Sequence, residues 1–408
     1  MGTKSINFII TNIEAIVLPK SGRDEYKDIK NDYLRLRVTA KGVKSYSVYK
    51  RLKGKNPVRV TFGKFPSLPP EAAKKQARLI VADIEQGINP NTMRRKNAIE
   101  AMTLNTAFDE YIHARNLRPK TVAGYDSVFK CHLFNLHDKR LKEISRSDIN
   151  KTFKRISSEA QANLSMRLIR AIFNFAKEEY LDEHDLPIFT DNPTAILSHR
   201  RSWHRIEPRN THVRSNQLEK FAQSLAIVRN NSTESENAPA ITDALLFALL
   251  TGLRRKEILN LKWNNIYLES EYFTIPDQIA KNGKELELPI TNYLKQIFSW
   301  RYLNKKSEFV FGASNHTGQI KEPKKTVNKV VQLSEAKCQF HDLRRTFATT
   351  AEHLDLSIYK RRRLMNHLPR RDDMTEQYTV LTSETLKSAA EKIQDTIANN
   401  IGWFPYYN

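Results

Sequence analysis

The sequence has little of what holds many small or metal-dependent proteins together. Its 408 residues include two cysteines. Cys131 and Cys338 lie far apart and form no metal-ligand motif, and two thiols in so long a chain are typical of a reducing compartment. The pattern gives no support for a disulfide. The sequence also lacks a P-loop and a cluster of carboxylates, the usual signatures of nucleotide-dependent and metal-assisted chemistry. We therefore expect neither a metal nor a cofactor.

Long apolar runs are also missing. No stretch approaches the roughly 18–20 apolar residues that a membrane-spanning helix needs. The first residues lack the basic start, the long apolar run and the small-residue cleavage site of a secretory signal peptide. We therefore expect a protein of the bacterial cytoplasm that does not bind a membrane.

Negative charge is scarce relative to positive charge. The chain has 67 Lys and Arg against 45 Asp and Glu, a net charge of +22, and the excess is spread along the whole sequence. A solvated basic surface is one interpretation. We favour a polyanionic partner, because each Lys or Arg set against a phosphate releases condensed counterions. The spread of charge predicts extended contact along nucleic acid, and so a location on the nucleoid.

The length predicts two or three domains, and the first covers residues 1–90. Residues 33–38 alternate apolar and basic side chains, and residues 45–50 and 58–62 follow after turns, which predicts three antiparallel strands. A helix should begin at Pro69-Pro70. The strand faces outside the core are expected to carry a set of basic and aromatic side chains: Arg35, Arg37, Lys50, Arg51, Arg59, Lys64, Tyr46 and Tyr49. Such a face could lie in a DNA groove or be merely solvated.

The middle of the chain changes to a helical period. We expect a partly helical linker over residues 91–102, a bundle of about four helices over 103–197 and a basic linker over 198–212. The linker could cross a duplex between two domains or be plainly exposed. Basic side chains in these segments suit phosphate contacts: Arg118, Lys120, Arg167, Arg170 and Arg201.

Residues 213–408 should form the last domain, and they hold the residues with chemical potential. His341 and Arg344 are three apart on one predicted helix face, and His367 and Tyr378 follow. Two histidines, an arginine and a tyrosine are a useful set for moving a phosphoryl group without a metal. Upstream, Arg254 follows Thr251-Gly252, with Glu257 placed to hold its guanidinium, and Lys281 stands at an Asn-Gly hairpin between strands 272–275 and 286–290.

Two stretches of the sequence resemble a known family. The order Arg254, Lys281, His341-x-x-Arg344, His367, Tyr378, with Thr-Gly-Leu-Arg ending at Arg254, resembles the catalytic domain of the tyrosine recombinases, the phage integrase family, over about residues 211–386. Residues 18–90 resemble the arm-site domain of one group of these proteins. The resemblance implies a multidomain, mainly α fold with small β-sheets: an N-terminal α+β arm-binding module, an α-helical core-binding bundle and a mixed α/β catalytic domain.

The resemblance also implies a role for each candidate. Arg254 and Arg344 would bind the scissile phosphate, and His341 and His367 would hydrogen-bond it and assist proton transfer. Lys281 would be the general acid and Tyr378 the nucleophile. The sequence differs from the common family pattern in two places: Asn366 stands where glycine is commoner, and the step from His367 to Tyr378 is eleven residues rather than nine.

The implied partners are double-stranded DNA at core and arm-type sites and three further copies of the chain, as a homo-tetramer on DNA. A DNA-bending host protein and an excision directionality factor are further candidates. Two other functions remain open: a type IB topoisomerase using the same chemistry, and a non-catalytic DNA-binding regulator that kept the fold. The C-terminal helix and aromatic tail could pack on a neighbouring subunit or on their own.

Overall fold

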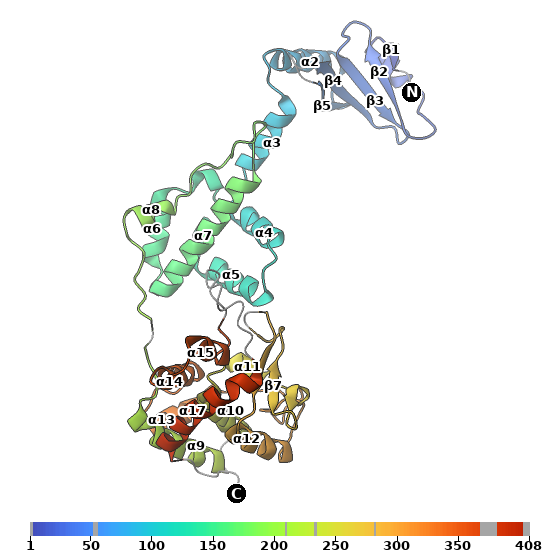
Figure 1. Cartoon of the computed structure of the whole chain (residues 1–408). Helices are drawn as coiled ribbons and strands as arrows, with labels where there is room; N and C mark the ends of the chain where they lie inside the picture. The colour runs from blue at the N-terminus through green and yellow to red at the C-terminus, as the bar shows by residue number, and fades with distance from the viewer. Residues whose placement is uncertain are drawn as a thin grey trace. The chain divides into compact units, whose positions relative to one another are not determined.

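The chain forms two compact units, Met1–Glu207 and Pro208–Asn408 (Figure 1). The structure, a computed structural model, describes residues 3–51, 56–208, 210–231, 235–280, 283–367 and 382–402. The first unit contains two hydrophobic clusters and the second contains one. No helix in the described part of the chain combines the length and apolar character that crossing a membrane requires.

The first unit begins with a five-stranded sheet in which neighbouring strands follow chain order. The strands are β1 (Lys4–Ile6), β2 (Arg23–Asp28), β3 (Leu34–Thr39), β4 (Lys44–Arg51) and β5 (Pro57–Phe65). β1 runs parallel to β2, and the other pairs are antiparallel. The three predicted strands are confirmed as β3, β4 and β5. The sequence did not reveal β2, because it reads Arg-Asp-Glu-Tyr-Lys-Asp and buries only Tyr26 and Asp28.

Helix α2 (Pro70–Glu85) covers one face of the sheet, and it begins at the predicted prolines. Its buried stripe comprises Ala73, Ala77, Ile80, Val81 and Ile84, as the helical period predicts. Short α1 (Ile10–Glu14) contributes Ile13 to the same core. The other sheet face carries the basic side chains of β3, where Arg35 and Arg37 alternate with buried Leu34, Leu36 and Val38.

Two residues expected on the outer face lie on the core face instead. Tyr46 is fully buried, with its ring 6.2 Å from those of Phe8 and Phe62. Lys50 forms a 3.0 Å ion pair with Glu85 of α2. Side chains of a strand alternate between faces, so Tyr46 and Lys50 cannot share the face of Tyr49. The prediction was wrong for both because it judged them by polarity rather than by position in β4.

The rest of the first unit is helical. Its elements are α3 (Pro90–Glu100), α4 (Leu104–Ala114), α5 (Pro119–His132), the 3₁₀ turns η1 (Phe134–Leu136) and η2 (Leu141–Glu143), α6 (Arg146–Arg155), α7 (Glu159–Glu179) and α8 (Ala195–His199) (Figure 1). Ser145 and Asp148 form a capping box that starts α6. In the core, the Phe108 and Phe129 rings stack with centroids 4.1 Å apart. The division into domains at the predicted boundaries stays a prediction.

Both predicted linkers are more structured than their composition indicated. Helix α3 occupies most of residues 91–102, and Asn91 and Arg94 donate hydrogen bonds to the carbonyls of Arg59 and Thr61 in β5. The start of the second predicted linker packs on the bundle: Asn163 and the His204 backbone exchange hydrogen bonds of 2.9 and 3.2 Å. Residues 198–202 are exposed, as one of the two interpretations of this segment has it, whereas Trp203 and His204 are half-buried. The function of residues 198–212 as a linker stays a prediction.

The second unit is built around one helix that is buried on nearly all sides. α10 (Ala238–Thr251) packs against helices on several sides, and most of its sequence is apolar; its one charged residue, Asp243, is buried as well. The surrounding elements are α9 (Ser215–Asn230), α11 (Arg255–Leu259), η3 (Trp263–Asn265), α12 (Asn292–Leu303), α13 (Lys324–Ser334), α14 (Phe340–Glu352), α15 (Ile358–Leu364) and α17 (Ser383–Ile401) (Figure 1). The predicted hairpin strands are confirmed as β7 (Tyr272–Ile275) and β8 (Leu286–Pro289), antiparallel to each other, with β6 (Ile266–Tyr267) beside β7.

The C-terminal end of α10 is held by two other helices. Gln394 of α17 donates a 3.0 Å hydrogen bond to the Leu250 carbonyl and accepts one from Thr291, which caps α12. Gly252 then ends α10 with φ +64°, in the left-handed region. A Cβ at Gly252 would lie 2.6 Å from Cδ1 of Phe347 in α14. Only glycine suits this position, because both its backbone conformation and its close packing exclude a side chain.

We expect Gly252→Ala to destabilise the second unit by at least about 1–2 kcal/mol, the cost of a left-handed non-glycine residue, with the Phe347 clash in addition. Gly124→Ala is the control, because a Cβ there meets nothing within 4 Å and Gly124 lies inside α5. Thermal unfolding should show a lower Tm for Gly252→Ala and an unchanged or slightly higher Tm for Gly124→Ala. Equal Tm values for the two variants would contradict this account of the α10 terminus.

Candidate active site

Arg254 lies at the N-terminus of α11, where a buried carboxylate holds it. Glu257 accepts a 2.9 Å hydrogen bond from the Arg254 backbone N–H at Oε2, and another of 2.9 Å from Arg254 Nη1 at Oε1. Glu257 is 1% exposed, whereas the Arg254 side chain is 27% exposed. The expected pairing is present, but Arg254 is the N-cap of the helix rather than a residue on its face. The backbone contact and the guanidinium contact together orient the carboxylate.

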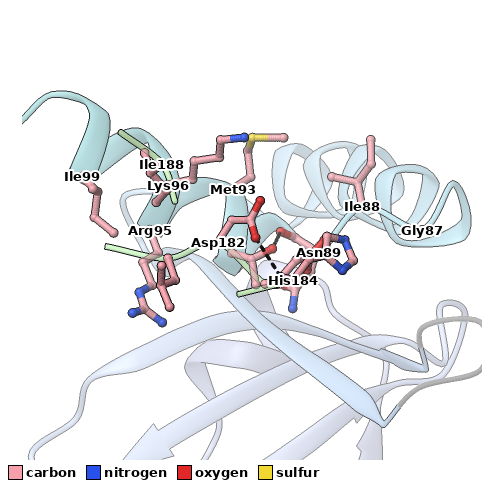
Figure 2. A pocket seen from close by; sticks show the side chains of 13 residues that line it. Gly87, Ile88, Asn89, Met93, Arg95, Lys96, Ile99, Asp182, His184 and Ile188 are labelled. Carbon is pink, nitrogen blue, oxygen red and sulfur yellow. Dashed lines mark hydrogen bonds and ion pairs between the residues drawn. The ribbon is translucent and has the colours of Figure 1, made fainter. Parts of the chain in front are cut away.

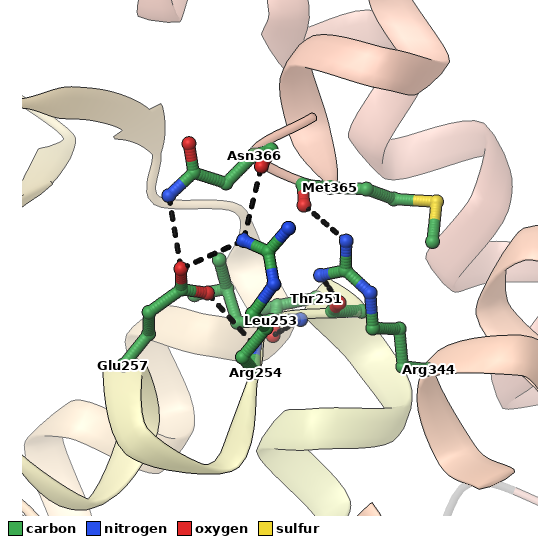
Figure 3. A network of polar contacts seen from close by, with 8 residues as sticks. Thr251, Leu253, Arg254, Glu257, Arg344, Met365 and Asn366 are labelled. Atoms are coloured by element: carbon green, nitrogen blue, oxygen red, sulfur yellow. Dashed lines mark hydrogen bonds and ion pairs between the residues drawn. The ribbon is translucent and has the colours of Figure 1, made fainter. Parts of the chain in front are cut away.

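Arg344 connects two loops that are far apart in sequence. It projects from α14 and is 5% exposed. Its Nη1 donates to the Gly252 carbonyl and its Nη2 to the Met365 carbonyl, both at 2.6 Å (Figure 3). Burial lowers the pKa of Arg344 to about 10, with the charge of Arg254 acting in the same direction and Glu257 opposing it. Arg344 therefore remains a cation at neutral pH.

Asn366 completes the connection at the end of α15. It has φ +51° and is 3% exposed. Its carbonyl accepts a 3.0 Å hydrogen bond from Arg254 Nη1, and its Nδ2 donates one of 3.0 Å to Glu257 Oε1 (Figure 3). The sequence showed Asn366 only as a replacement for the commoner glycine. One sequence signal could have indicated its position at a helix end: asparagine, like glycine, tolerates the left-handed conformation found there.

The two histidines stand beside this arginine pair, and each is partly exposed to solvent and partly covered by the protein. Desolvation, followed by the charges of Arg344, Arg254 and Arg362, lowers the pKa of His367 from 6.5 to about 4. The pKa of His341 is also lowered, first by desolvation and then by Arg345 and Arg344. Both imidazoles are therefore neutral near pH 7, the form that can accept a proton.

The structure thus brings together four of the predicted catalytic residues: Arg254, Arg344, His341 and His367. The charges of both arginines act on both histidines. Lys281 and Tyr378 lie outside the described residues. Of the three guanidinium nitrogens of Arg254, only Nη1 has a hydrogen-bond partner within the described residues. Nε and Nη2 can therefore bind an anion. Two guanidinium groups and two neutral imidazoles suit a phosphodiester, and they can stabilise charge that develops on it.

A cavity of about 290 Å³ lies in the first unit between α3 and residues 181–188 (Figure 2). Its carboxylate at Asp182 already accepts hydrogen bonds from the backbone of His184 and Leu186, which lower the pKa of Asp182. Among the described residues, no three His, Cys, Asp or Glu side chains gather in a way that could hold a metal ion.

Most basic residues predicted on the sheet share the face away from α2. Register places Arg35, Arg37, Arg59 and Lys64 on this face, and Lys50 on the other. Glu25 pairs with Arg35 at 3.7 Å and with Arg59 at 2.9 Å. The guanidinium groups of the same two arginines lie 5.8 and 5.2 Å from the centre of the Tyr49 ring. Arg37 Nε has no hydrogen-bond partner in the described structure, although it is buried.

The predicted phosphate-binding residues of the bundle differ in exposure and in their contacts. Arg118 and Lys120 are exposed at the start of α5, Arg167 is exposed on α7, and Arg201 is exposed after α8. Arg170 is engaged within the unit: it donates a 3.0 Å hydrogen bond to Ser198 Oγ, and its guanidinium lies 4.7 Å from the Trp203 ring centre. Its observed role is to hold the Ser198–Trp203 segment on α7.

Two segments of the chain, one in each unit, match models of known protein families. Residues 212–384 match the model of the phage integrase family, and residues 10–97 match that of the arm DNA-binding domain. Residues 212–384 therefore form a phage integrase family domain, and residues 10–97 form an arm DNA-binding domain. All the predicted catalytic residues lie within the first match, and the basic sheet face lies within the second.

Relatives and solved structures are similar to the same parts of the chain. Prophage integrase IntF of Escherichia coli K12 is 28% identical over 179 residues, which span 42% of this chain and 37% of IntF. A lambda integrase tetramer bound to a Holliday junction aligns with a TM-score of 0.53 and 18% identity, over 83% of this chain and 96% of that one. The Tn1549 transposon integrase in complex with transposon right end DNA gives 0.54 and 18%, over 72% and 99%. The predicted fold class is confirmed.

We expect His367 of this phage integrase family domain to titrate with a pKa near 4 in the DNA-free protein, well below the ordinary value of 6.5. Arg362→Gln should raise this midpoint, because it removes one nearby positive charge. Since an unfolded chain protonates His367 at its ordinary pKa, folding stability should fall as the pH drops from 6.5 toward 4. NMR titration of the His367 ring in both proteins is the measurement. A midpoint at or above 6.5 would show that the arginine pair does not act on this ring.

Proposed function

We propose that this protein is a site-specific DNA recombinase that integrates and excises a mobile element, such as a phage or a genomic island. It cleaves and rejoins duplex DNA through a covalent 3′-phosphotyrosine intermediate. The observation that supports this most strongly is the cluster of Arg254, Arg344, His341 and His367 in a phage integrase family domain. Such a cluster fits a phosphodiester without a metal.

In this proposal the scissile phosphate lies against the free nitrogens of Arg254 and the adjacent histidines. Tyr378 Oη attacks phosphorus, a bond from phosphorus to Tyr378 forms, and the bond to the 5′ oxygen breaks. The tyrosine proton leaves to a neutral imidazole, and Lys281 gives a proton to the departing 5′ oxygen. A phenol with a pKa near 10 is a poor nucleophile at neutral pH, so the nearby cations and a base are required.

The phosphotyrosine link conserves the energy of the broken phosphodiester bond. A 5′ hydroxyl of a second strand can attack phosphorus and displace Tyr378, which restores a phosphodiester and the free phenol. The net change is one phosphodiester exchanged for another, so no nucleotide hydrolysis is needed to join the strands. This balance fits a chain whose sequence has no P-loop.

The partners in this proposal are DNA at two kinds of site and further copies of the chain. The sheet face of Arg35, Arg37, Arg59 and Lys64 binds arm-type DNA, and the bundle and second unit bind the core site. The lambda integrase tetramer on a Holliday junction supports four copies acting together. A DNA-bending host protein and an excision directionality factor would act on the arm-bound complex in the bacterial cytoplasm. The arm DNA-binding domain favours recombination over simple relaxation by a topoisomerase.

Tyr378→Phe should abolish the covalent adduct that the wild-type protein forms with a nicked suicide substrate carrying its core site, because phenylalanine has no oxygen to attack phosphorus. Denaturing gel electrophoresis of labelled DNA detects the adduct. Tyr359→Phe is the matched control, a tyrosine of α15 that should be dispensable for the adduct. An adduct that still forms with the Tyr378→Phe variant would mean that another residue is the nucleophile.

Arg35→Gln/Arg37→Gln should impair integration but leave cleavage of an isolated core site unchanged, because the sheet face contacts only arm-type DNA. For arm-DNA binding by the double variant, the slope of log K against log salt concentration should become shallower by roughly 0.9 per lost phosphate contact. Lys50→Gln is the control, because Lys50 lies on the opposite face with Glu85. Equal loss of integration and core cleavage would argue against an arm-binding face.

A further inference from the structure

Asn366 has a side chain that its backbone conformation does not require. Its φ of +51° lies in the left-handed region, where glycine is the least strained residue. Asparagine tolerates this region better than other residues, but tolerance alone would leave its amide free to face water. Here the residue is 3% exposed, and Nδ2 donates a 3.0 Å hydrogen bond to Glu257 Oε1. The amide of Asn366 is therefore buried in contact with a carboxylate, and this contact affects how Arg254 is held.

The effect on Arg254 follows from how the Glu257 carboxylate is shared between its hydrogen-bond donors. Oε2 accepts from the Arg254 backbone, while Oε1 accepts from both Arg254 Nη1 and Asn366 Nδ2. Each hydrogen bond to a buried carboxylate narrows the orientations open to it. Arg254 Nη1 also donates to the Asn366 carbonyl at 3.0 Å. Asn366 therefore fixes Arg254 twice, directly by its carbonyl and indirectly through Glu257.

The same residue precedes His367 in the chain. The Asn366 backbone N–H donates to the Arg363 carbonyl, and Arg344 holds the preceding Met365 carbonyl at 2.6 Å. The loop that presents His367 is thus the loop that aligns Arg254. A shift of one group would move the other, so the amide joins two contributors to the site in one rigid arrangement.

We propose that Asn366 is a positioning residue for DNA cleavage, which aims the free nitrogens of Arg254 at the phosphate through Glu257. This inference rests on the proposed recombinase function. Ground-state binding to DNA depends on many basic residues and tolerates small errors in one guanidinium. Stabilisation of the transition state does not tolerate such errors, because the hydrogen-bond donors must lie where negative charge develops on the phosphate. Loss of the amide therefore lowers the cleavage rate more than the affinity for DNA.

Asn366→Gly tests this directly, because glycine keeps the left-handed backbone and the carbonyl but removes the amide. At saturating suicide substrate we expect a single-turnover cleavage rate at least about tenfold lower, which corresponds to about 1.4 kcal/mol in the barrier. The Kd for core-site DNA and the Tm should stay close to wild type. Asn304→Gly is the matched control, because Asn304 ends α12 on the surface, and it should cleave at the wild-type rate.

Asn366→Asp supplies a readout that a purely structural role would not move. Aspartate is the same size as asparagine, but its charge would repel Glu257, so cleavage should be slow at neutral pH. Acidification that protonates the introduced carboxylate restores a donor toward Glu257, so the rate relative to wild type should rise as the pH falls. A constant ratio across pH would overturn the proposal, as would an unchanged rate for Asn366→Gly. A parallel loss of rate, affinity and Tm would also overturn it and would make Asn366 a stability residue.

A positioning role for Asn366 can be measured even if the proposed function fails. Absence of any Tyr378-dependent adduct in the wild-type protein would refute the function, not the contact. NMR of the Arg254 guanidinium in the DNA-free protein then decides: rotation about its Nε–Cζ bond should be faster in Asn366→Gly than in wild type and unchanged in Asn304→Gly. Equal rotation in all three proteins would refute the positioning role.

Discussion

The buried contacts of Arg344 determine whether the site exists. This one guanidinium bonds the carbonyls of Gly252 and Met365, which belong to distant parts of the chain. An unpaired buried carbonyl or guanidinium is costly, so each of the three groups keeps the other two in place. The α10–α11 corner and the α15 terminus are thereby joined, and Arg254 and Asn366 form a hydrogen bond across the same junction. The apolar packing of α10 supports this network, while one side of Arg254 remains open to solvent.

The sheet of the first unit follows a different physical logic. Its arginines are neither buried ion pairs nor freely solvated side chains. Arg35 and Arg59 both pair with Glu25 and lie close to the Tyr49 ring. Desolvation is the main cause of the lowered pKa of Arg37, and nearby positive charges lower it further. This crowding of like charge is unfavourable without an anion, which is consistent with the basic face being a binding surface.

Local pattern was sufficient for much of this protein. Alternation of apolar and basic residues identified β3, the proline pair located the start of α2, and the spacing of His341 and Arg344 placed both on α14. These signals are local because a strand or helix repeats within a few residues. Composition, by contrast, misassigned Tyr46 and Lys50, since polarity does not say which face of a strand a side chain lies on.

The sequence by itself determined the residue types of the site and their order along the chain. Tertiary structure alone decided that Arg254 caps a helix, that Arg344 is occupied by two carbonyls, and that Asn366 reaches Glu257. The side-chain contacts of Arg344 and Asn366 join residues separated by 21 to 109 positions, with the Arg344–Met365 pair the nearest. No periodicity spans such distances, because contacts of this kind depend on how packed helices bring their ends together.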